Sequence, residues 1–246
     1  MWTSPRQARA TQGGRARRMA IVMSLLALAS LTACTAAAAP SPASTAGADA
    51  PAPFPESGEI AAGTYLVTGY TLPFEITVPG GWSSGEGAGL VKDDPDHPDD
   101  GAVFVIFWPA DYVPTDACAW QEALVPVGPT AEAFVDAMTA QTSTASTAPV
   151  EVMVGDYSGF EFDHSVEGDT DIRACDTGRL CIHSDRAREC GRWYSYPSER
   201  ETYRVVDLNG ERAVLAVGQF HDTTNPALTT EARAIFDSIV FVRPEE

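Results

Sequence analysis

The chain is poor in basic residues. Its 246 residues include 16 lysines and arginines against 34 aspartates and glutamates, a formal net charge of −18. Five of the arginines fall within the first 18 positions, so the rest of the chain keeps eleven basic residues and a formal charge of −23. Such a charge repels nucleic-acid phosphates and anionic lipid headgroups. We therefore expect no nucleic-acid partner.

Long apolar runs and cofactor motifs are also missing. The apolar run at residues 19–33 is about 15 residues long, whereas a bilayer-spanning helix needs roughly 20. No glycine-rich phosphate loop or other cofactor motif is recognisable. We expect no cofactor, and we interpret the short run as a cleaved export signal.

The end of that apolar run indicates lipid attachment. Arginines precede the run, and it ends in Leu31-Thr-Ala-Cys34, which resembles the lipobox of bacterial lipoproteins. We predict a lipoprotein signal peptide over residues 1–33 and a lipid on Cys34, which would hold the protein on the extracytoplasmic face of the cell membrane. The alternative is an ordinary signal peptide with a chance cysteine. Arg17-Arg18 leaves the general and twin-arginine export routes both open.

A composition change then separates a tether from a folded domain. Residues 35–56 are almost wholly alanine, proline, serine, threonine and glycine, which bury too little apolar surface to offset the entropy of ordering. We predict a flexible linker over residues 34–56 and a single domain over 57–246.

Within the domain, short strands alternate with turn signals. Asn209-Gly210 is typical of a tight hairpin turn because both residues tolerate positive φ. The run at 102–108 is apolar on both faces, which favours a central strand. The predicted strands cover residues 65–70, 74–78, 89–92, 102–108, 150–154, 159–163, 203–208 and 212–220.

Two segments have helical spacing. Thr130 is placed to cap a helix whose apolar residues run from Ala131 to Met138, and Thr230 to cap a second helix that continues to Ile239. A shorter helix is expected over 117–124. Few, separated helices among antiparallel strands favour the α+β class over a doubly wound parallel sheet.

Four cysteines remain once Cys34 is assigned to lipid. An even number in an exported chain points to two disulfides, with three possible pairings. We favour Cys181–Cys190, which closes a short loop, and Cys118–Cys175. A metal site formed by three of these cysteines and His183 is the alternative, but the short Cys-x-x-Cys spacing of structural zinc sites is missing. We expect no metal.

A serine motif offers a catalytic alternative. Gly81-Trp-Ser-Ser-Gly85 matches the nucleophile elbow of α/β-hydrolases, with Ser83 as nucleophile. The elbow requires a helix immediately after the serine, and the glycines at 85, 87 and 89 disfavour one. The possible bases are His97, His164, His183 and His221, and no triad can be assembled from them.

An acidic loop offers a second alternative. Residues 93–100 carry five carboxylates, which are hard ligands suited to calcium, but the EF-hand spacing is absent. A solvated loop is the simpler interpretation, with a calcium or small-ligand carrier as the alternative.

Aromatic residues cluster after Cys190. Arg192, Trp193, Tyr194 and Tyr196 combine the residue types enriched in binding hot spots. The same residues serve equally well to cover a small satellite core. If any part of the chain touches a partner, we expect it to be this segment.

Several segments recur in an order typical of one family: Thr115-Asp-Ala-Cys-Ala-Trp-Gln121, Val127-Gly-Pro-Thr130, Gly155-Asp-Tyr-Ser-Gly-Phe160, Val205-Val-Asp-Leu-Asn-Gly-Glu-Arg212 and Ser238-Ile-Val-Phe241. They resemble exported proteins and lipoproteins of high-GC Gram-positive bacteria. The resemblance implies a PsbP-like fold, a twisted antiparallel sheet flanked by helices, as in mycobacterial LpqN-type lipoproteins. It also implies a largely non-enzymatic binding or scaffolding role toward a protein or another envelope component. The segment 181–190 with its aromatic tail departs from the family pattern.

The cysteine assignment predicts a simple labelling result. Because all four domain cysteines are expected in disulfides, the lipidated native protein should gain no mass from a thiol alkylating agent. After unfolding and reduction it should gain four adducts, measured by intact mass. Alkylation of four thiols in the native protein would contradict the assignment. Each disulfide is expected to add roughly 2–4 kcal/mol of stability.

Overall fold

The computed structural model describes residues 50–70, 72–95 and 103–243. The predicted signal peptide, Cys34 and the linker up to residue 49 lie outside these residues. No helix within the described ranges combines the length and the apolar character needed to cross a membrane.

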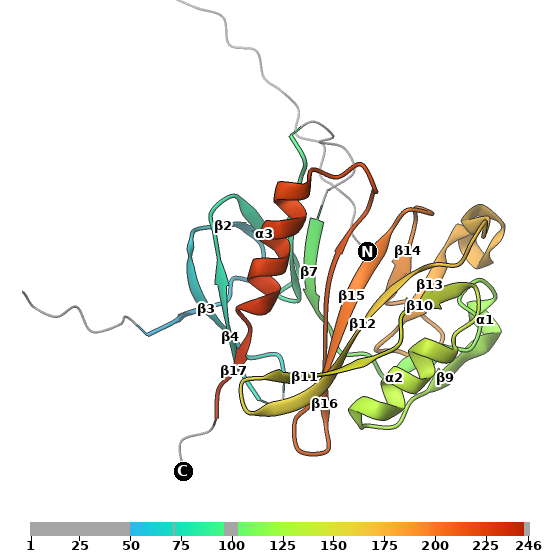
Figure 1. The fold of residues 1–246 in the computed structure, drawn as a ribbon, viewed down its shortest axis with the longest axis horizontal. Helices are drawn as coiled ribbons and strands as arrows, with labels where there is room; N and C mark the ends of the chain where they lie inside the picture. The colour runs from blue at the N-terminus through green and yellow to red at the C-terminus, as the bar shows by residue number, and fades with distance from the viewer. Residues whose placement is uncertain (1–49, 71, 96–102, 244–246) are drawn as a thin grey trace, which may run out of the picture. The chain divides into compact units, whose positions relative to one another are not determined.

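A nine-stranded antiparallel sheet forms the centre of the fold (Figure 1). Its strand order is β10-β12-β15-β16-β7-β6-β5-β2, with β11 also paired to β12. The strands are β2 (Gly58–Ile60), β5 (Trp82–Ser84), β6 (Gly89–Lys92), β7 (Val103–Phe107), β10 (Thr144–Ser146), β11 (Val150–Val154), β12 (Tyr157–Val166), β15 (Arg200–Asp207) and β16 (Arg212–Gln219).

The hairpin and the central strand predicted from the sequence are both confirmed. β15 and β16 pair from Arg200↔Gln219 to Asp207↔Arg212, and Asn209 and Gly210 take φ values of 65° and 97° in the turn between them. The central strand β7 lies between β16 and β6.

A smaller sheet contains β1 (Ala52–Pro53), β3 (Gly63–Val67), β4 (Phe74–Val78) and β17 (Val240–Phe241), in the order β1-β3-β4-β17. β1 runs parallel to β3, and Phe54 packs against the core. The boundary predicted at residue 57 is therefore corrected: residues 52–54 already belong to the fold. An apolar Phe54 anchors a segment whose composition otherwise resembles a linker.

Three α-helices are present in the described residues: α1 (Trp120–Ala123), α2 (Ala131–Ala140) and α3 (Pro226–Asp237). Thr130 caps α2 as predicted, because its Oγ1 accepts a hydrogen bond from the Ala133 N–H at 3.2 Å. The predicted start of α3 at Thr230 is wrong. Asn225 caps that helix by accepting from the Ala227 N–H at 2.9 Å, and Pro226 suits the first turn because it has no N–H to satisfy.

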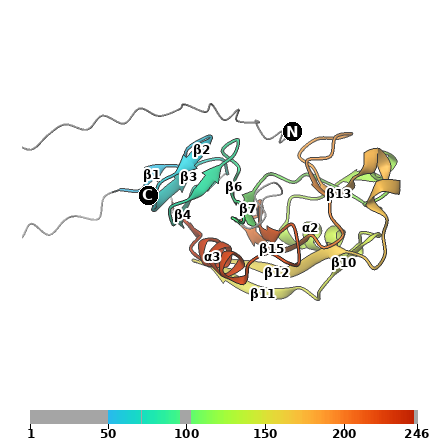
Figure 2. The same cartoon turned by 90° about the horizontal axis from the view of Figure 1, so that it is seen from above.

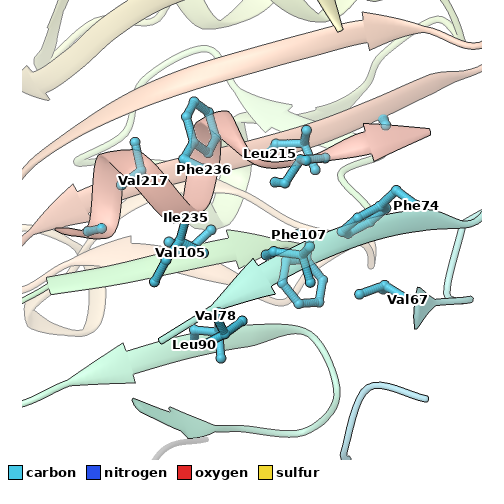
Figure 3. Close-up of a cluster of buried hydrophobic side chains, with 14 of the residues drawn as sticks. Val67, Phe74, Val78, Leu90, Val105, Phe107, Leu215, Val217, Ile235 and Phe236 are labelled. Carbon is cyan, nitrogen blue, oxygen red and sulfur yellow. The ribbon is translucent and has the colours of Figure 1, made fainter. Parts of the chain in front are cut away.

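Both faces of the central sheet are buried. On one face, Leu215 and Val217 pack with Phe236 of α3 and with the smaller sheet, in the cluster that Figure 3 shows. On the other face, Val214 and Ala216 pack with α2 and with two small hairpins. These hairpins pair β8 (Tyr112–Pro114) with β9 (Leu124–Pro126), and β13 (Leu180–His183) with β14 (Arg192–Tyr194).

The described residues form a mainly antiparallel β fold with few helices. The sheet is antiparallel and carries one longer helix on each face, but strands dominate the described residues. The expectation of a sheet flanked by helices is met only in part, because hairpins cover much of the surface that helices were expected to cover.

Close approach of β12 and β15 depends on Gly159. A Cβ at this position would lie 2.4 Å from the Val205 carbonyl oxygen and 3.0 Å from the Val206 Cα. We expect Gly159→Ala to destabilise the fold by about 3 kcal/mol, because backbone must move to accommodate the methyl group. Gly69→Ala is the control, since nothing lies within 4 Å of its Cβ, and it should change stability by less than about 0.5 kcal/mol. Equal denaturant midpoints for the two variants would contradict this account.

Candidate functional site

All four domain cysteines are oxidised in the pairs favoured by the sequence. Cys118 is bonded to Cys175 and Cys181 to Cys190. The alternative thiolate metal site does not form, since its cysteines are already in disulfides. The described part of the chain holds no group of three or more residues arranged to bind a metal ion.

The expected binding surface after Cys190 is largely internal, so that prediction is wrong for two of its residues. The Tyr194 side chain is fully buried, and that of Arg192 is 14% exposed. β14 pairs with β13 and turns these side chains toward the central sheet. The satellite-core interpretation holds for both residues.

Arg192 is the centre of a buried polar network. Its Nε donates to Glu201 Oε1 at 2.6 Å, and its Nη2 donates to the Glu199 carboxylate. Both carboxylates are shielded from solvent. Burial disfavours the charge on Arg192, but the facing Glu201 and Glu199 outweigh that effect and raise its pKa. The guanidinium is therefore a permanent cation that neutralises buried acid.

Two tyrosines and a histidine complete this network. The hydroxyls of Tyr194 and Tyr203 both donate to Glu201 Oε2, and His164 Nδ1 lies 2.9 Å from the Tyr194 hydroxyl. Burial, followed by the negative charge of Glu201, raises the pKa of both tyrosines. They remain neutral hydrogen-bond donors.

Buried histidines line the same region. Burial, with the positive charge of Arg192 nearby, lowers the pKa of His164 to about 3, and the same two causes lower that of His183 to about 3. His164 Nε2 and His183 Nδ1 have no hydrogen-bond partner among the described residues. Both rings are neutral at physiological pH.

Trp193 and Tyr196, the other two members of the expected surface, are partly buried. The Arg179 guanidinium lies 4.3 Å from the Trp193 ring centre, and the Tyr196 ring lies 4.3 Å from that of His221. Each ring already has a partner from the same fold, so neither forms an open aromatic patch.

Ser83 does not lie on a nucleophile elbow. It occupies the middle of β5, paired with Glu59 on one side and Val91 on the other, and β6 follows instead of a helix. Its side chain is exposed, and among the described residues no hydrogen bond joins it to a histidine. The local geometry is that of an ordinary strand residue.

The acidic loop is described only at its start. Residues 96–100, which include His97, lie outside the described ranges. Asp94 is 2% exposed, and its Oδ2 accepts from the Asn225 N–H at 3.3 Å, next to the first turn of α3. This carboxylate has a structural contact within the fold.

A separate acidic groove lies where α2 begins. Its volume is about 460 Å³, and it lies between the first turn of α2, the β11–β12 hairpin and the end of β15. Glu132, Glu151 and Asp207 supply three carboxylates, and Met153 and Phe160 supply apolar surface. None of the lining residues is basic. The groove therefore combines negative charge with apolar surface.

Strand register explains how this groove forms. Glu151 is opposite Phe160, and Met153 is opposite Ser158, so all four side chains share one face of the sheet. α2 begins at Ala131 and leaves this corner of the sheet uncovered. The sequence did not predict the groove, because its three carboxylates come from segments that lie far apart along the chain. The apolar residues of 150–154 indicated a strand there, but no binding site.

No family model matches the chain, and no curated protein matches it either. Among solved structures, the chain is similar to the solution structure of cyanobacterial PsbP (CyanoP) from Synechocystis sp. PCC 6803. The match covers 82% of this chain and 100% of that one, with 10% identity and a TM-score of 0.35. The similarity to PsbP is weak, and a relation to LpqN-type lipoproteins stays a prediction.

The two buried histidines predict acid sensitivity. Because their pKa of about 3 lies below the ordinary 6.5, the unfolded chain binds more protons between these values, and stability falls as pH drops below 6.5. At pH 4 the loss is up to about 3 kcal/mol per histidine. Glu199 acts in the opposite direction, since burial raises its pKa.

Replacing one of the histidines tests this origin. His183→Leu should flatten the dependence of melting temperature on pH between 7 and 4, measured by circular dichroism. The leucine has no proton to gain and keeps a similar volume against Phe134 and Tyr203. Parallel curves for the variant and the parent protein would contradict the assignment.

Proposed function

We propose that this protein is a lipid-anchored, extracytoplasmic binding domain without a catalytic role of its own. The lipobox-like sequence at Cys34 supports the anchor, and two disulfides support an oxidising compartment outside the cytoplasm. The linker that precedes the fold gives the domain reach from the membrane.

The observation that carries the binding proposal is the acidic groove. An open concave site with an apolar floor and a few polar groups is the usual form of a binding site. Here the lining residue Met153 is 64% exposed. Apolar side chains this exposed are costly to leave in water, and a partner that covers them recovers that free energy.

The buried network supports a structural role for the other polar residues. Arg192, Glu199 and Glu201 satisfy one another in the interior, and His164 and His183 are closed off from solvent. A general base must reach the proton that it removes from a substrate, and these groups lie behind packed strands. Their arrangement is that of a polar core.

Site-directed crosslinking in cells tests the proposal. A photo-crosslinking amino acid at Met153 should give one discrete adduct, whereas the same group at Val125, which is 40% exposed but lies outside the groove, should not. Cys34→Ala should move the protein out of the membrane fraction and reduce that adduct.

Two results would count against this proposal. One is the same set of adducts from Met153 and Val125, which would indicate non-specific contact. The other is covalent modification of Ser83 by a fluorophosphonate probe, which would support an envelope hydrolase instead.

A further inference from the structure

β11 has an unpaired edge. It pairs with β12 alone, and no other backbone hydrogen bond involves residues 150–154 in the described part of the chain. Figure 2 shows β11 on the outer side of β12. Such an edge is a ready template for another strand.

The turn at Gly155-Asp156 determines which backbone groups face outward. Val154 and Tyr157 flank this two-residue turn, and residues in that position exchange both backbone hydrogen bonds. Along an antiparallel pair, the backbone groups of successive residues point alternately toward the partner strand and away from it. The N–H and C=O groups of Glu151 and Met153 therefore point away from β12. Glu151 and Met153, whose backbone groups point outward, both line the groove, and their side chains share one face of the sheet.

The charge of the groove specifies the partner's charge. Glu132 and Glu151 form no ion pair within the described residues, and the Asp207 carboxylate accepts a hydrogen bond from the Gly210 N–H at 2.7 Å. The overall negative charge of the chain adds long-range attraction for a cation. A basic side chain fits this corner, and an acidic one is repelled.

From these observations, and resting on the proposed binding function, we infer that the partner is an extended basic peptide segment that pairs with β11 as an added strand. Its main chain bonds to the outer edge of β11, in the mode of β-strand addition. A lysine or arginine opposite Glu151 lies over the groove, and an apolar residue two positions away contacts Met153. The peptide residues that alternate with these two lie beside Val150 and Val152, on the face of the sheet opposite that of Glu151 and Met153.

This pattern is tested by fluorescence anisotropy with a capped, labelled peptide, Lys-Thr-Val-Lys-Val-Leu-Thr, and the full folded domain. Glu151→Lys should weaken binding about tenfold, because it replaces an attraction with a repulsion across one strand pair. Glu122→Lys, which changes another exposed acid, outside the groove, is the matched control and should change affinity less than twofold. Melting curves confirm that both variants are folded.

Two further peptides separate strand addition from simple charge attraction. A peptide with alternate N-methylated amides keeps its charge but cannot pair with an edge, and it should bind at least tenfold more weakly. A peptide with glutamates in place of lysines should not bind. Equal binding of the N-methylated and parent peptides, or of the acidic and basic ones, would overturn the inference.

The lysine content permits an independent check. Lys92 is the single lysine of this chain, so a carbodiimide, which joins carboxylates to amines, reports mainly on lysines of the partner. The peptide lysine should be joined to Glu151, Glu132 or Asp207, as located by mass spectrometry. If Met153 crosslinks in cells to a partner without a basic extended segment, the binding function stands and this inference fails. If Met153 gives no discrete adduct, the proposed function itself fails.

Discussion

The ion pair between Arg192 and Glu201 is the constraint on which half of the molecule depends. Arg192 comes from the disulfide-bonded hairpin and Glu201 from the central sheet, so the pair fixes one to the other. Removing one partner of a buried pair typically costs 3–5 kcal/mol, since the remaining charge is left uncompensated. Here a single guanidinium donates to two carboxylates. Two tyrosine hydroxyls donate to one of these carboxylates, and His164 lies beside one of the hydroxyls.

The same network explains why the aromatic segment is not a surface. Tyr194 is amphipathic, and its hydroxyl needs a partner when buried. Glu201 accepts this hydrogen bond in the interior. The Tyr194 ring is therefore buried, and the β13–β14 hairpin packs over the central sheet. The opposite situation holds at the groove, where α2 leaves Met153 uncovered and no basic residue of the described chain lines the site beside the acids.

Local chemistry made much of the fold predictable. Asn209-Gly210, the Thr130 cap and the alternation of the strands each act over a few residues, and the structure confirms them. The errors have two origins. The start of α3 was missed although its signal is local, since Asn225 and Pro226 directly precede the apolar spacing. The other two depend on residues elsewhere in the chain: Phe54 packs against the core, and Arg192 is buried because it bonds to Glu201 of the next strand. The three acids of the groove share no sequence pattern at all.

The disulfide connectivity bears on how the protein is made. Counted from the N-terminus after Cys34, the first domain cysteine is bonded to the second and the third to the fourth. In a chain that leaves a translocation channel unfolded and N-terminus first, Cys118 meets Cys175 before any other domain cysteine has emerged, and Cys181 then meets Cys190. If the proposed export follows the general route, oxidation in order of emergence yields the native pairs directly, and maturation needs an oxidase but no exchange of mispaired bonds.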